Sequence, residues 1–191
     1  MSLEEYKAII QPLLSEKRYY HSLCVSKAAK ELAKKYGADV QKAEIAGILH
    51  DIMKDLPPEQ QLEKMKQYGV RLTEVERSAQ KLWHAMLGTA YLKNELHIED
   101  TEILGAVRYH TTGRANMTLL EKILFIADFI SADRDYFGVD NLRKAAEINL
   151  DEAMLEGFVY TITDLTEQRK AIHPDTIAAY NQVALKCANK K

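Results

Sequence analysis

The sequence predicts an all-α protein. Three segments open with the capping-box pattern that starts helices, at Ser2–Glu5, Thr73–Glu76 and Thr118–Glu121. Gly37 and Gly69 each follow a helix-forming segment, where a left-handed residue commonly ends a helix. No stretch shows convincing strand alternation, so helices are expected throughout.

Taken in order, these signals and the apolar spacing predict a single domain, residues 1–191, built as a helical bundle. Pro57-Pro58 can stop the third helix and start the fourth. The nearest strand candidates, residues 108–114 and 159–163, are both short. Helices are expected near residues 2–13, 16–36, 40–54, 58–68, 74–80, 83–96, 100–110, 118–132, 139–147, 150–168 and 174–189.

Composition argues against several classes of protein. The net charge is −2 with the signs intermixed, so we expect neither a nucleic-acid partner nor a membrane-surface partner. No apolar run approaches the ~20 residues that a spanning helix needs. The N-terminal segment lacks the features of a signal peptide, and Cys24 and Cys187 lack metal-type spacing. We therefore expect a cytoplasmic protein with reduced thiols.

The adjacent pair His50-Asp51 lies in the segment Glu44–Leu56 (EIAGILHDIMKDL). Apolar residues of this segment fall at i, i+3, i+4 and i+7: Ile45, Ile48, Leu49 and Ile52. The helix is therefore expected to be enclosed, with Gly47 marking the close approach of a neighbouring group. An enclosed imidazole and carboxylate each need a partner, and one divalent cation would satisfy both. A hydrogen-bonded core histidine is the alternative.

Two further residues could join this pair. Asp128 lies in the nearly all-apolar segment ILFIADFI, where an ionised carboxylate needs a metal or a salt bridge to a buried Arg or Lys. His21 shares a helix face with Val25 and Ala28, so its side chain should point inward.

The order His21…His50-Asp51…Asp128 resembles the metal-binding signature of the HD-domain phosphohydrolase superfamily. Three longer segments resemble the bacterial YqeK family within it: LWHAMLGTAYL, ILGAVRYHTTGRANMTLLEKILFIADFISADRDYFGVDNLR and AIHPDTIAAYN. The resemblance covers roughly Tyr6 to Asn181. It implies an α-helical, symmetrical dinucleoside tetraphosphatase that cuts diadenosine tetraphosphate into two ADP with an iron-type metal.

The resemblance also implies roles for individual residues. It makes His21, His50, Asp51 and Asp128 the metal ligands. It assigns phosphate contacts to Arg18, His84, His110, Thr111 and Arg134. One or two divalent ions are expected, iron first and Mn or Co as alternatives.

Asp51, His84 and His110 are the expected catalytic residues, because a histidine that titrates near working pH could protonate the leaving oxygen. His84 and His110 could instead hold a second metal. We expect them to serve the substrate, because Asp133 and Asp135 lie beyond the helix that carries Asp128, unless Asp51 bridges two ions. Lys54 is a further candidate for phosphate, or a solvated helix-end lysine.

Two other functions are open from the sequence. One is an HD-domain nucleotidase or phosphomonoesterase acting on mononucleotides, and the other is a non-enzymatic nucleotide-binding sensor. An intact ligand set argues against the sensor, because a site freed from catalysis has no chemical need of every ligand. The expected partners are a nucleotide substrate and ADP product, with a homodimer as one possible assembly.

Overall fold

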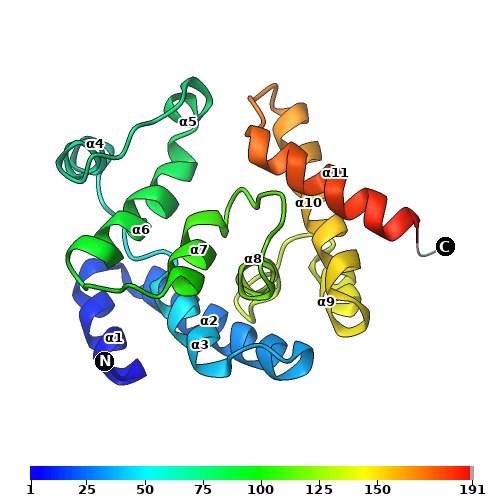
Figure 1. Cartoon of the computed structure of the whole chain (residues 1–191), viewed down its shortest axis with the longest axis horizontal. Helices are drawn as coiled ribbons and strands as arrows, with labels where there is room; N and C mark the ends of the chain where they lie inside the picture. The colour runs from blue at the N-terminus through cyan, green and yellow to red at the C-terminus, as the bar shows by residue number, and fades with distance from the viewer. Residues whose placement is uncertain (190–191) are drawn as a thin grey trace.

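The computed structural model describes residues 1–189, and these form eleven α-helices, two short 3₁₀ helices and no strand (Figure 1). The all-α prediction is therefore confirmed for the described residues. The α-helices are α1 (Leu3–Ile10), α2 (Glu16–Tyr36), α3 (Val40–Leu49), α4 (Pro58–Gln67), α5 (Glu74–Ser78), α6 (Trp83–Asn94), α7 (Thr101–Tyr109), α8 (Leu119–Ile130), α9 (Val139–Ile148), α10 (Leu150–Glu167) and α11 (Pro174–Ala188); the 3₁₀ helices are η1 (Gln11–Leu13) and η2 (Gln80–Leu82).

The helix boundaries follow the local signals closely. All three expected capping boxes form, with the Ser2, Thr73 and Thr118 side chains accepting from the backbone three residues on. Gly37 ends α2 with φ 77°, and Gly69 follows α4 with φ 69°. These positive φ values strain any residue with a Cβ, so glycine is the residue these helix ends need.

Helix α8 lies at the centre of the fold, where Figure 1 shows it end-on between the N-terminal and C-terminal helices. It packs against α2, α3 and α7 on one side and against α9 and α10 on the other. Phe125 of α8 stacks at 4.8 Å, centroid to centroid, on Phe158 of α10, and both are fully buried. Burying each ring contributes about 2–3 kcal/mol, so α8 holds the two halves together.

Helices α2 and α3 are in close backbone contact at Gly47. A Cβ built there would lie 2.5 Å from Ser26 Cα and 2.8 Å from Ser26 N. The expectation that Gly47 permits a close approach is confirmed, and the neighbour is backbone that cannot move aside. This contact sets how the helix ending before His50 sits against the helix carrying His21.

Three expectations about local structure are wrong. Helix α3 ends at Leu49, so residues 50–54 are turns rather than helix, closed by bonds such as Lys54 N to Asp51 O at 2.8 Å. The first helix breaks at Gln11 into η1, because Pro12 cannot continue the α-helical hydrogen bonds. The two strand candidates are a helix end and turn (108–114) and part of α10 (159–163).

No helix within residues 1–189 is both long and apolar enough to cross a membrane.

Candidate metal centre

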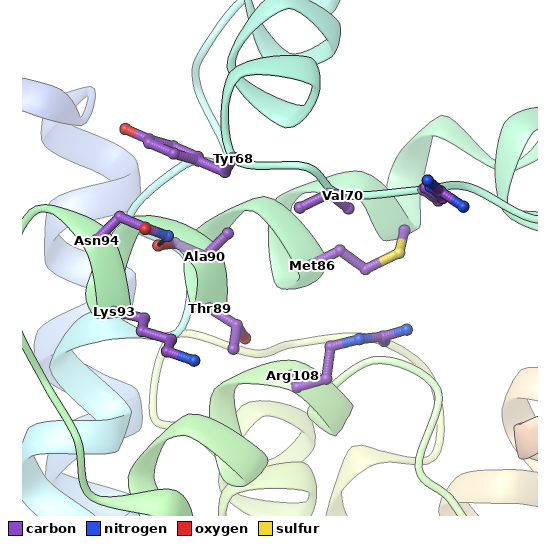
Figure 2. Close-up of a pocket in the computed structure, with 9 residues that line it drawn as sticks. Tyr68, Val70, Met86, Thr89, Ala90, Lys93, Asn94 and Arg108 are labelled. Carbon is purple, nitrogen blue, oxygen red and sulfur yellow. Dashed lines mark hydrogen bonds between the residues drawn. The ribbon is translucent and has the colours of Figure 1, made fainter.

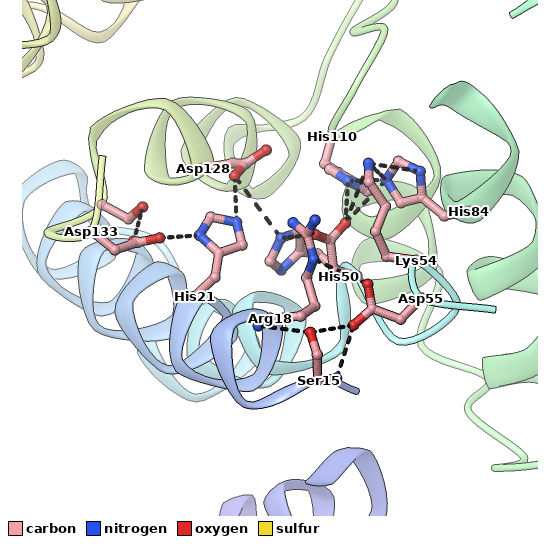
Figure 3. A network of polar contacts seen from close by, with 12 residues as sticks. Ser15, Arg18, His21, His50, Lys54, Asp55, His84, His110, Asp128 and Asp133 are labelled. Atoms are coloured by element: carbon pink, nitrogen blue, oxygen red, sulfur yellow. Dashed lines mark hydrogen bonds and ion pairs between the residues drawn. The ribbon is translucent and has the colours of Figure 1, made fainter. Parts of the chain in front are cut away.

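The residues singled out in the sequence converge where α2, α6, α8 and the ends of α3 and α7 meet (Figure 3). Among residues 1–189, three overlapping groups of side chains could each hold an ion: His21, His50 and Asp51; His50, His110 and Asp128; and Asp51, His84 and His110. The expected ligands therefore share one cluster with His84 and His110. His97, by contrast, is exposed and outside it.

His50 directly follows α3, and its Nδ1 lies 2.7 Å from the carbonyl of Gly47. An Nδ1–H donated to this carbonyl leaves Nε2 as a lone pair. That Nε2 is buried and has no hydrogen-bond partner within residues 1–189. It faces Asp51 Oδ2 at 3.6 Å and Asp128 Oδ1 at 4.0 Å. Burial lowers the pKa of His50 to about 4, so the ring is neutral at pH 7, as a metal ligand must be.

His110 repeats this arrangement at the end of α7. Its Nδ1 lies 2.7 Å from the carbonyl of Val107, again three residues back, so its Nε2 also presents a lone pair. This Nε2 is 3.0 Å from Nε2 of His84, which reaches in from α6. Burial lowers the pKa of His84 to about 3. The Nε2 atoms of the two rings are thus directed at one point.

Asp51 lies between the two histidine groups. Its Oδ1 is 3.1 Å from His84 Nε2 and 3.7 Å from His110 Nε2. Its Oδ2 faces His50 and accepts a hydrogen bond from Arg18 Nη1 at 2.8 Å. Burial raises the pKa of Asp51, but the surrounding histidines outweigh it and hold the pKa well below its usual range. An anionic carboxylate with one oxygen toward each group can bridge two cations.

Asp128 is not the unpaired carboxylate expected from its apolar segment. It accepts from Arg134 Nη2 at 2.5 Å and lies 2.9 Å from His21 Nε2, and its side chain is 20% exposed. Although burial raises its pKa, His21 and Arg134 lower it well below the usual range. The salt bridge to an arginine, which the sequence left open as the alternative to a metal, is therefore present, because Arg134 pairs with Asp128. Its position within 4.0 Å of His50 still makes it a candidate ligand.

The orientation of His21 depends on Asp133, a residue that sequence reasoning considered only for a second ion. Asp133 Oδ2 lies 2.7 Å from His21 Nδ1, and Asp133 Oδ1 accepts from Ser131 Oγ at 2.7 Å. Burial lowers the pKa of His21, but Asp128 and Asp133 outweigh it and the net shift is upward. A carboxylate behind a ligand histidine fixes its tautomer and turns Nε2 toward the centre. The sequence feature that could have pointed to Asp133 is the acidic loop that follows α8.

That loop is held by a second residue that the sequence did not reveal. Arg143 of α9 donates to the carbonyls of Ile130, Ser131 and Arg134 at 3.2, 3.0 and 2.8 Å. Arg134 Nε in turn donates to the carbonyl of Asp128 at 2.9 Å. The loop is thereby fixed with the Arg134 guanidinium beside the cluster, although Arg134 itself is one-third exposed and open to an anion.

Arg18 and Lys54 add positive charge at the same centre. Arg18 contacts Asp51, and its Nε lies 3.7 Å from Asp55, which also accepts from the backbone N and Oγ of Ser15 (Figure 3). Lys54 Nζ lies 3.1 Å from His84 Nδ1 and 4.0 Å from Asp51 Oδ1, so it is at the cluster rather than free in solvent. Burial lowers the pKa of Lys54.

Thr111 lies beside the cluster, and His173 caps helix α11. Thr111 adjoins His110, and its Oγ1 is buried with no hydrogen-bond partner within residues 1–189. His173 caps α11 by accepting from Asp175 N at 3.1 Å, and its Nε2 lies 3.4 Å from Glu76.

The cluster matches what a divalent transition metal requires. Neutral imidazoles and anionic carboxylates are the ligands of Fe, Mn and Co sites, and the lone pair of His50 Nε2 needs a positively charged or hydrogen-bearing partner. The surrounding guanidinium and ammonium groups suit an anionic phosphate. The arrangement can therefore hold a metal and a phosphorylated compound together.

Comparisons with known proteins agree with this geometry. Residues 18–133 match the HD domain family. The symmetrical bis(5'-nucleosyl)-tetraphosphatase of Halalkalibacterium halodurans is 41% identical over 177 residues, with 93% of this chain and 94% of the relative covered. The protein of the same name from Bacillus subtilis is 39% identical, with 95% and 97% covered.

A crystal structure of a predicted HD superfamily hydrolase involved in NAD metabolism, from Clostridium acetobutylicum, superposes with a TM-score of 0.93. It is 39% identical and covers 97% of this chain and 98% of its own. The chain therefore belongs to the HD domain family and, within it, to the group of symmetrical bis(5'-nucleosyl)-tetraphosphatases.

Proposed function

We propose that this protein hydrolyses diadenosine tetraphosphate symmetrically to two ADP, in a reaction that depends on bound metal. The family membership supports the substrate. The observation that carries the metal dependence is the lone pair of His50 Nε2, which is buried without a partner in the described chain and faces Asp51 and Asp128. A purely structural cluster would pair that nitrogen, because an unsatisfied buried polar atom costs about 1–3 kcal/mol.

In this proposal His21, His50, Asp51 and Asp128 hold one ion, with iron as the first choice because mixed imidazole and carboxylate ligands suit it. When bound, the ion would lower the pKa of a water molecule and screen the phosphoryl oxygens. His50→Ala and Asp128→Ala should each lose stoichiometric metal and activity while the helical circular dichroism stays unchanged. Full metal content in purified Asp128→Ala would remove Asp128 from the ligand set.

His84 and His110 were expected to serve the substrate, and the geometry favours a second ion instead. The objection to a second ion was the lack of a bridging carboxylate, and Asp51, whose Oδ1 faces this pair, is the carboxylate that we propose as the bridge. Their two Nε2 atoms lie 3.0 Å apart, close enough to share one cation. We therefore propose that Asp51, His84 and His110 hold the second ion.

Metal analysis of identically prepared variants separates the two roles. His84→Ala and His110→Ala should each bind one ion fewer than the wild type and keep one tightly held ion. Wild-type metal content with reduced turnover in both variants would return the pair to the substrate role.

The chain's own cations then bind and orient the polyphosphate. Arg18 and Arg134 each contact a proposed ligand carboxylate and carry further N–H groups for phosphoryl oxygens. Lys54 Nζ lies 3.1 Å from His84 Nδ1, and burial lowers the pKa of its ammonium, so in this proposal Lys54 contacts the polyphosphate and can donate a proton to it. Thr111 supplies a free hydroxyl beside His110.

Product analysis on an ion-exchange column tests the reaction. Diadenosine tetraphosphate should give ADP alone. ATP with AMP would show asymmetric cleavage, and release of inorganic phosphate from mononucleotides would favour the phosphomonoesterase alternative. Binding without any turnover in metal-loaded protein would favour a sensor.

A further inference from the structure

A hollow lies on the other side of α6 and α7 from the metal centre. It has a volume of about 420 Å³ and lies between the end of α4, α6 and α7 (Figure 2). We call it the back pocket; its walls include Tyr68, Arg71, Met86, Thr89, Lys93 and Arg108. Small-molecule sites typically occupy about 300–1,000 Å³, so the size is sufficient for a ligand.

The back pocket is separate from the metal centre because the shared helices present opposite faces to each. On α6, Met86 and Lys93 are seven residues apart and lie on one face, whereas His84 is rotated from Met86 by about 200°. On α7, Arg108 precedes His110 by two residues and is rotated from it by a similar angle. A ligand here would not touch the proposed metal ligands.

The charge of the back pocket is positive. Arg71, Lys93 and Arg108 line it, and no acidic side chain does so within residues 1–189. In the same part of the chain, Arg71 and Lys93 form no ion pair shorter than 4.0 Å, while Arg108 uses Nη2 to contact Glu76 at 3.1 Å. Three cations facing one hollow repel one another, and an anion relieves that repulsion.

An aromatic ring and apolar side chains complete the pocket. The Tyr68 hydroxyl donates to Glu95 at 2.8 Å, which fixes the ring at the edge of the hollow, as Figure 2 shows. The buried Met86 and the half-buried Val70 form an apolar part of the wall. A ring beside apolar side chains suits a flat base, since stacking a base on an aromatic residue contributes about 1–3 kcal/mol.

We propose that the back pocket binds a nucleoside phosphate, with the phosphates on Arg71, Lys93 and Arg108 and the base beside Tyr68. Guanidinium groups favour phosphate through paired, charge-assisted hydrogen bonds. This second site does not depend on the hydrolysis proposed above, because no residue is shared between the two.

The methyl group of Met86 reports on this site directly. Metal-loaded protein carrying [¹³C-methyl]methionine is titrated with ADP, and the Met86 signal is assigned with Met86→Leu. The signal should shift with saturation in the wild type and also in Arg134→Ser, which weakens the proposed catalytic site alone. A Met86 signal that does not move at millimolar ADP would overturn the proposal, whatever the catalytic activity.

Charge variants test how the ligand is recognised. Arg71→Ser/Lys93→Ser should raise the Kd read from Met86 about tenfold while leaving hydrolysis unchanged, since two exposed ion pairs are lost. Lys27→Ser/Lys144→Ser removes two exposed lysines of α2 and α9 that do not line the pocket, and it should leave the Kd at the wild-type value. Adenosine, which lacks phosphate, should not shift Met86 at the same concentration. An equal shift with adenosine, or an unchanged Kd in the pocket variant, would refute a phosphate site.

Discussion

Replacing Asp133 should weaken metal binding without removing any ligand. Asp133 lies 2.7 Å from His21 Nδ1 and turns Nε2 of that ring toward Asp128. Hydrogen-bond partners behind ligand histidines typically contribute 10–100-fold to metal affinity, or about 1.4–2.7 kcal/mol. Asn keeps an oxygen that can accept from Nδ1–H but loses the charge, so Asp133→Asn should lower the metal affinity about tenfold. Asp133→Ala loses both the acceptor and the charge, so it should lower the metal affinity by about 100-fold.

The assay is competition with a chelator of known affinity, which gives the dissociation constant of the metal independently of turnover. Asp135→Asn is the matched control, because Asp135 lies in the same loop, is exposed and makes no hydrogen bond recorded within residues 1–189. Ser131→Ala removes only the 2.7 Å bond to Asp133 and should have a smaller effect than either Asp133 variant. Equal metal affinity in Asp133→Ala and Asp135→Asn would refute an orienting role for Asp133.

The other predictions concern phosphate binding, packing and pH. Arg18→Ala and Arg134→Ala should keep their metal, because each change leaves the paired carboxylate free to bind it. Each should lower kcat about 100-fold, because a cation that stabilises the phosphoryl oxygens is lost. Unchanged kinetics in both variants would show that the polyphosphate does not bind at these arginines. Gly47→Ala should lower the unfolding free energy by about 2 kcal/mol in urea titrations, since its Cβ would lie 2.5 Å from Ser26 Cα. Lysine hydrogen bonds outweigh burial and lower the pKa of Asp151 to about 2, below its unfolded value of about 3.9. Its contribution of about 1–2 kcal/mol, reduced by water screening, should be present above pH 4 and lost as the pH falls toward 2. Asp151→Asn should therefore destabilise the protein at pH 7 more than at pH 3, and an equal difference at both would contradict this assignment.

Helix boundaries were predictable where the deciding interaction is local. The Ser2, Thr73 and Thr118 caps bond to groups three residues away, so the pattern in the sequence contains both partners. The end of α3 is different. The segment from His50 to Leu56 has good helical spacing, yet residues 50–54 form turns that place Asp51 against Arg18 of another helix. The spacing of apolar residues in the sequence reports only local structure, so it could not predict this pairing between distant residues.

The sequence predicted which side chains gather at the candidate site, but not the residues that hold those side chains in place. His21, His50, Asp51 and Asp128 follow an order that the sequence displays, and all lie in one cluster. Asp133 contacts His21, which lies 112 residues away in the sequence. Arg143 donates to backbone carbonyls of the loop after α8, up to 13 residues away. In the sequence, an acidic residue in a loop and an arginine on a helix cannot be told apart from ordinary solvent-exposed side chains.

The ends of α3 and α7 explain the orientation of two proposed metal ligands, His50 and His110. A helix leaves its last carbonyls without intrahelical donors, and His50 and His110 each donate Nδ1–H to the carbonyl three residues earlier. The same hydrogen bond satisfies the helix end, fixes the tautomer and leaves Nε2 facing the cluster. Because backbone rather than a neighbouring side chain orients these rings, they keep their direction in a cluster whose other members are charged and mutually dependent. Replacing either histidine by glutamine, which could not make this short contact with the same ring geometry, should therefore impair metal binding even though glutamine also carries an acceptor.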